Sequence, residues 1–254
     1  MLATADRATV ITYAALLVVT AAAWLAMFWS PMAGEDMAGM EMAITPTLGD
    51  GVAFVAAWAI MMAAMMLPSA MPMIGLYAAT QRSAVNATRT SVAVSAFALM
   101  YVALWALTGV PIYFASVALM AVAPATLTYT IAAVLIVAGV FQLSPLKQVC
   151  LRHCRSPLGF LLGHWRAGWR GAVSMGWAHA LYCLGCCGAL MVVLVVAGAM
   201  GLPWVLLIAC VVAAEKILPR GEWIARMTGV ALALLGVAVA AEPGLAALLR
   251  AWAM

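Results

Sequence analysis

The apolar segment 171–198 carries three cysteines and a histidine at a spacing that suits a metal site. Four potential ligands stand at i, i+4, i+7 and i+8: His179, Cys183, Cys186 and Cys187. A helix would place all four on one face. Thiolate and imidazole are ligands of soft metal ions such as Cu(I). The same residues allow two other interpretations, a redox thiol pair or the simple packing of small apolar side chains.

A second apolar segment, 52–79, is rich in methionine, whose thioether sulfur also binds Cu(I). Three of its methionines are three or four residues apart and therefore share a helix face: Met62, Met65 and Met66. Pro68 and Pro72 predict a kink, which a membrane helix tolerates where it faces protein or a cavity. Methionine also serves as flexible apolar filler, so packing is the alternative to a metal-binding stripe.

Two further sulfur groups lie outside these segments. The loop 30–50 has four methionines and four acidic residues, and three of the methionines are the candidate ligands, namely Met37, Met40 and Met42. They predict a collecting site for Cu(I), although they could instead pad a loop at the lipid interface. In the basic segment 145–170, Cys150 and Cys154 are one turn apart if helical, next to His153 and two arginines that favour thiolate. They suit an exit or relay site and are too few for a closed zinc site.

The composition indicates that lipid is the solvent for most of the surface. The chain has 254 residues, of which 68% are hydrophobic and 8% charged, whereas soluble domains carry about 25% charged residues. The net charge of +4 is therefore no argument for nucleic-acid binding. We expect an all-α fold, a polytopic transmembrane bundle forming a single domain over residues 1–254.

About seven segments have the length of a membrane span, for which about 20 apolar residues are needed. They are 9–29, 52–79, 90–117, 126–144, 171–198, 203–218 and 224–241. We expect 9–29 to be the first span and not a cleaved signal peptide. Lys and Arg gather in the segments that are cytoplasmic if the N-terminus is inside, so we expect the C-terminus outside and a bacterial inner-membrane location. A six-span arrangement with the tail inside remains an alternative.

This topology brings the sulfur groups to similar depths. Met65 and the pair Cys183 and Cys186 fall near the middle of their segments, as does Cys210 in 203–218. We therefore expect the two sulfur-rich helices to meet halfway through the bilayer. Glu215 and Lys216, at the inner end of 203–218, are expected to form an interfacial ion pair. The aromatic and basic residues of 145–170 favour an interfacial helix, with a docking surface as the alternative.

Four sequence blocks resemble a bacterial family of predicted metal-binding integral membrane proteins of unknown function. They are WAIMMAAMMLPSAMPMIGLY, FQLSPLKQVCLRHCRSPLGFLLGHWRAGWRGA, MGWAHALYCLGCCGALM and AAEKILPRGE. They lie between Trp58 and Glu222 and so cover most of the chain. The resemblance implies a bound metal without specifying which one. Relatives carry glycine where this chain has His179, so the resemblance does not extend to that residue.

Together these features predict a membrane protein that binds a soft metal ion, most simply Cu(I), for uptake or for delivery to a membrane cuproenzyme. Its expected partners are the lipid bilayer, the ion and a membrane or periplasmic cuproprotein. We expect no enzymatic activity, and no P-loop is present to drive a pump. The alternatives are an accessory or assembly subunit of a larger membrane complex and a membrane thiol oxidoreductase. Heme in place of copper also remains open.

Overall fold

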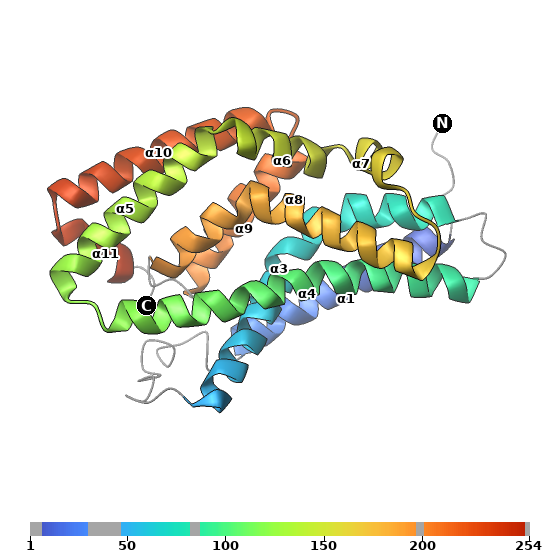
Figure 1. Ribbon diagram of the computed structural model, residues 1–254, viewed down its shortest axis with the longest axis horizontal. Helices are drawn as coiled ribbons and strands as arrows, with labels where there is room; N and C mark the ends of the chain where they lie inside the picture. The colour runs from blue at the N-terminus through green and yellow to red at the C-terminus, as the bar shows by residue number, and fades with distance from the viewer. Residues whose placement is uncertain (1–6, 30–46, 82–86, 197–200, 252–254) are drawn as a thin grey trace.

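A computed structural model describes residues 7–29, 47–81, 87–196 and 201–251 (Figure 1). Its regular elements are all helices within these ranges, which agrees with the expected all-α fold. The helices are α1 (Arg7–Trp29), α3 (Leu48–Thr80), α4 (Ala87–Met120), α5 (Pro124–Leu143), α6 (Pro145–Arg155), α7 (Pro157–His164), α8 (Gly168–Val196), α9 (Leu202–Ile217), α10 (Gly221–Ala241) and α11 (Gly244–Ala251).

Six of the described helices are long and apolar enough to cross a membrane, one fewer than the sequence predicts. They are α1, α3, α4, α5, α8 and α10. The remaining predicted span, 203–218, forms as α9, which has only 16 residues and is shorter than the roughly 20 that a span needs. The basic segment 145–170 is mostly helical and contains α6 and α7.

Local sequence signals fix where several helices begin. Thr47 and Asp50 form a capping box at α3, in which the Thr47 hydroxyl accepts from the Asp50 amide and the Asp50 carboxylate accepts from the Thr47 amide. The same carboxylate also receives a hydrogen bond from the Thr47 hydroxyl at 2.7 Å. Ser144 ends α5 and caps α6 by accepting from the Lys147 amide at 3.2 Å. This serine therefore sets the start of the helix that carries Cys150 and Cys154.

Helix pairs pack closely where glycine replaces a side chain. α5 lies beside α10, α4 beside both α3 and α8, and α1 beside α3 (Figure 1). A Cβ atom added at Gly139 would lie 2.6 Å from the Gly229 carbonyl oxygen, so α5 and α10 touch through their backbones. At Gly176 a Cβ atom would lie 2.6 Å from the Phe97 carbonyl oxygen, which joins α8 to α4 in the same way. Small residues at such contacts are the usual means by which membrane helices associate.

The core of the bundle lies between α3, α4 and α8. Pro68 and Pro72 are both inside α3, which continues to Thr80. On the same helix, the Trp58 indole donates to the Trp105 carbonyl at 3.1 Å and to the Thr108 hydroxyl at 3.0 Å on α4. These bonds hold α3 against α4, because an indole buried in an apolar region needs an acceptor.

We predict that Gly139→Ala lowers the thermal stability of the purified protein. The new methyl group would press on the backbone of α10, and such overpacking costs about 1–3 kcal/mol. The measurement is the unfolding temperature in detergent. Gly163→Ala is the matched control, since a Cβ atom there meets nothing within 4 Å and the unfolding temperature should not fall. Equal unfolding temperatures for both variants would contradict the tight α5–α10 contact.

Candidate metal centre

Three buried thiols on α8 form the centre of the candidate site. The sulfur atoms of Cys183, Cys186 and Cys187 all lie within 4.8 Å of one another. The spacing of three and four residues along a helix puts them on one face, and Cys183 Sγ is 3.7 Å from Cys187 Sγ. Cys187 and Cys186 also donate to the Cys183 carbonyl, at 2.9 and 3.2 Å. The local helix geometry alone therefore gathers three soft donors.

A thioether from α3 joins this cluster. Met66 Sδ lies 3.8 Å from Cys187 Sγ, and Met66 is fully buried. The two sulfur-rich segments thus meet, as the sequence indicates. Met62 and Met65 are buried in the same core as the three cysteines. Of the three candidate methionines of α3, Met66 is the one with a sulfur contact to the thiols within the described chain.

Cysteines of α6 extend the cluster to another helix. Cys154 Sγ is 3.7 Å from Cys186 Sγ. Cys150 faces Gly185, where a Cβ atom would lie 2.6 Å from its sulfur. Contacts with Cys183 and Cys186, followed by burial, raise the pKa of the Cys154 thiol well above its ordinary value. Burial, followed by the charge of Cys186, raises the pKa of Cys150. Because metals bind the thiolate, loading either cysteine would release a proton.

The remaining predicted ligands lie elsewhere. His179 is buried but stacks at 5.5 Å on Tyr101 and meets Phe160 at 5.4 Å, and its Nδ1 atom has no partner. It is not part of the close thiol group among the described residues. Cys210 is exposed on α9 and therefore does not join the buried thiols, while its expected depth near the middle of the bilayer stays a prediction. Met37, Met40 and Met42 lie outside the described residues.

Charged side chains lie beside the thiols, which the sequence did not predict. Lys216 Nζ is 3.0 Å from Cys183 Sγ and 3.0 Å from Ser69 Oγ. Glu215 instead accepts from Lys147 at 2.6 Å and from Gln142 at 3.0 Å. The expected ion pair between Glu215 and Lys216 is therefore wrong, because adjacent helix residues point in different directions. Both side chains are buried and are not at the interface.

Two further polar contacts shape the site. The Tyr101 hydroxyl on α4 is 3.0 Å from Cys183 Sγ. Arg155 donates to the carbonyls of Glu215, Leu218 and Pro219 at 3.3, 2.7 and 2.8 Å, and so caps the end of α9.

One sequence signal could have found the buried charges, namely Lys216 and Glu215 inside an apolar segment. The tyrosine carries no such signal.

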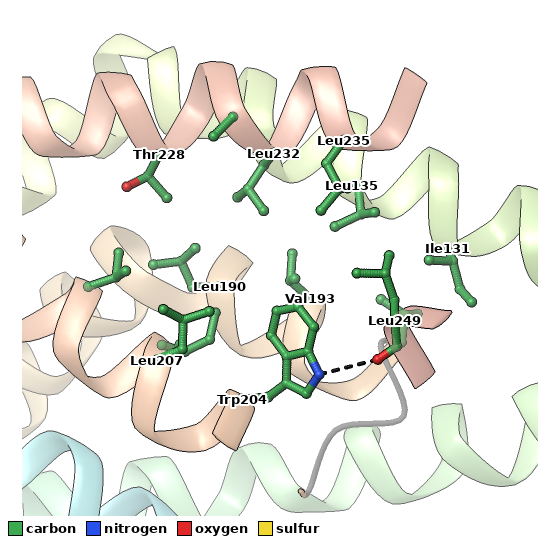
Figure 2. A pocket seen from close by; sticks show the side chains of 14 residues that line it. Ile131, Leu135, Leu190, Val193, Trp204, Leu207, Thr228, Leu232, Leu235 and Leu249 are labelled. Carbon is green, nitrogen blue, oxygen red and sulfur yellow. Dashed lines mark hydrogen bonds between the residues drawn. The ribbon is translucent and has the colours of Figure 1, made fainter. Parts of the chain in front are cut away.

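A separate cavity of about 350 Å³ lies between α5, α8, α9, α10 and α11 (Figure 2). Its lining is almost entirely apolar and contains no Cys, Met or His. The Trp204 indole at its wall donates to the Leu249 carbonyl at 3.3 Å, which satisfies this donor. This cavity offers nothing that would hold a metal ion, and the sulfur cluster remains the candidate centre.

The segment 145–170 packs into the protein more than the sequence indicates. Phe160 and Leu161 of α7 are buried, whereas Leu162, Trp165 and Trp169 are exposed. The exposed side chains are the ones that could contact headgroups, and the expected interfacial role of this segment stays a prediction. Phe160 instead forms part of the aromatic wall around His179.

Comparison with known proteins identifies a family that this chain matches. Residues 55–239, well over half of the chain, match a family described as PpoB2, copper chaperone. The match includes α8, the thiols of α6 and Met66. The match agrees with the resemblance to a metal-binding family, and it specifies copper as the metal. The family's description does not mention a membrane. No curated protein and no solved structure matches the chain.

We predict that Glu215→Gln destabilises the protein strongly. It leaves Lys147 buried without its carboxylate, and breaking a buried pair costs about 3–5 kcal/mol. Glu222→Gln is the control, because it breaks the exposed pair with Arg152, which is worth about 1 kcal/mol or less. Unfolding temperatures in detergent compare the two. If Glu222→Gln lowered the unfolding temperature more than Glu215→Gln, the structural role of the buried pair would be contradicted.

Proposed function

We propose, since the chain belongs to the PpoB2 copper chaperone family, that it holds Cu(I) at the thiol cluster of α8 and passes it to a membrane or periplasmic cuproprotein. The observation that carries the proposal is the close contact of Cys183, Cys186, Cys187 and Met66. Family membership supports metal handling without catalysis. Uptake of the ion and its delivery are two parts of the same proposed role.

The donor set favours a soft ion. The close group of possible ligands consists of thiols alone among the described His, Cys, Asp and Glu residues. Thiolate and thioether sulfur select Cu(I) over hard cations such as Mg²⁺ and Ca²⁺, which require oxygen ligands. The carboxylate of Glu215, which is next to Lys216 in the sequence, is already bound by Lys147 and Gln142. We therefore assign the site to Cu(I).

Successive sulfur contacts offer the ion a path. Cys154 and Cys186 are 3.7 Å apart, Cys183 and Cys187 are 3.7 Å apart, and Met66 is 3.8 Å from Cys187. An ion could exchange one ligand at a time along this series and remain bound to soft donors throughout. Cys150 extends the path along α6. In the expected topology this path leads from the middle of the bilayer toward the cytoplasm.

We predict that the wild-type protein, purified under reducing conditions, binds Cu(I) and its mimic Ag(I). A triple variant should lose the ion bound at the thiol cluster of α8; it carries Cys183→Ser, Cys186→Ser and Cys187→Ser. Cys210→Ser is the matched control, because this cysteine is exposed on α9 and should leave the stoichiometry unchanged. Metal content per protein is measured after removal of excess ion. Unchanged stoichiometry in the triple variant would refute the assignment.

We also predict that Met66→Leu weakens Cu(I) binding about tenfold, or ~1.4 kcal/mol. Leucine preserves the volume of the side chain while removing the thioether beside Cys187. Met73→Leu is the control, since Met73 is equally buried in α3 and is not among the proposed ligands. Affinities come from competition with a chromophoric Cu(I) chelator. Equal affinities for the two variants would remove Met66 from the site.

A further inference from the structure

Lys216 is the one positively charged side chain in contact with the thiol cluster of the described chain. Its ammonium lies 3.0 Å from Cys183 Sγ and 3.0 Å from the Ser69 hydroxyl, and the residue is 9% exposed. It reaches this position from α9, whereas Cys183 belongs to α8 and Ser69 to α3. The lysine thus enters the site from a third helix.

No carboxylate balances this charge within the described residues. The salt bridges there are Lys147–Glu215 and Arg152–Glu222, and neither includes Lys216. Glu215, its neighbour in sequence, is occupied by Lys147 and Gln142. A buried ammonium in a membrane protein is costly unless an opposite charge lies beside it. Among the described residues, the thiol cluster is the one source of negative charge that the ammonium contacts.

We propose that Lys216 is the counter-charge of the loaded centre and thereby determines how many thiolates bind the ion. The inference rests on the proposed function. Two thiolates carry −2, and Cu(I) with the ammonium supplies +2, so a centre of two thiolates is neutral. A third thiolate would leave a net negative charge in an apolar region, which is unfavourable. The third cysteine then stays a neutral thiol, and Met66 provides a neutral donor.

A purely structural role for Lys216 makes a different prediction. In that case the lysine would serve only to tie α9 to α8 and α3, and its removal would destabilise the protein with or without copper. As a counter-charge it would instead destabilise the metal-free protein, because its buried ammonium would then lack an opposite charge. Buried ionic groups are often replaced by apolar residues of similar volume without loss of stability. Lys216→Met keeps the length of the side chain and separates these roles.

We expect Lys216→Met to retain or raise the unfolding temperature of the metal-free protein and to weaken Cu(I) binding on the order of 100-fold or more. A chromophoric chelator competes for Cu(I) in each affinity measurement. Arg226→Met is the matched control. It also replaces one basic side chain by methionine, but this side chain is exposed on α10 and is not part of the proposed site, so the Cu(I) affinity should be nearly unchanged.

A double-mutant cycle with Cys183→Ser tests the contact itself. The loss caused by Lys216→Met should be at least about tenfold smaller when Cys183 is already serine, since the nearest thiolate is gone. In a Cys210→Ser background the loss should be undiminished. Additive losses with Cys183→Ser, or wild-type affinity in Lys216→Met, would overturn the inference.

Failure to fold is also informative. Lys216→Gln, which keeps an amide donor toward Ser69, is the second neutral variant. If both neutral variants unfold without metal, the lysine is structural and the inference is overturned. A wild-type protein that binds no Cu(I) would contradict the proposed function and the inference with it. A wild-type protein that binds Cu(I), with additive losses in the cycle, would contradict the inference alone.

Discussion

The buried salt bridge between Lys147 and Glu215, at 2.6 Å, is the interaction on which the arrangement of the site depends. It joins α6 to α9 inside an apolar bundle, where an unpaired charge would be costly. Because Glu215 faces α6, the next residue on α9 points about 100° away around the helix, which brings Lys216 to Cys183. Because Lys147 is held, α6 lies where Cys154 reaches Cys186. One ion pair thus positions both a ligand candidate and a cation.

Some contacts of the site form within one helix, and others join distant parts of the chain. Three thiols come together through helix periodicity alone, so any α8 helix would present them. Met66 and Cys154 arrive from distant parts of the chain, and their contacts require α3 and α6 to pack against α8. Backbone contacts at glycines, such as Gly176 against α4, allow that close packing. The metal centre therefore depends on the helix packing as a whole.

The sequence predicts the helices better than it predicts the polar contacts between them. Hydrophobic length identifies the long helices, and periodicity identifies the cysteine face, because both are local properties. The sequence predicts α9 as a membrane span, because the apolar run before Glu215 and Lys216 resembles one. The helix is shorter than a span, with 16 residues. It also pairs those two residues with each other, since their real partners, Lys147 and Cys183, are distant in sequence. His179 matches the helix face of the cysteines, yet the aromatic side chains around it hold it away from them.

The contact between Cys154 and Cys186 has a mechanical consequence. An ion held by sulfur from both α6 and α8 would act as a cross-link between two cysteines that are 32 residues apart in the sequence. Its binding energy would then add to the resistance of α6 against detachment, by about 2.7 kcal/mol when free ion is at one hundred times its dissociation constant. Departure of the ion from these two cysteines would loosen α6. The occupancy of the site by the ion and the rigidity of α6 would thus rise and fall together.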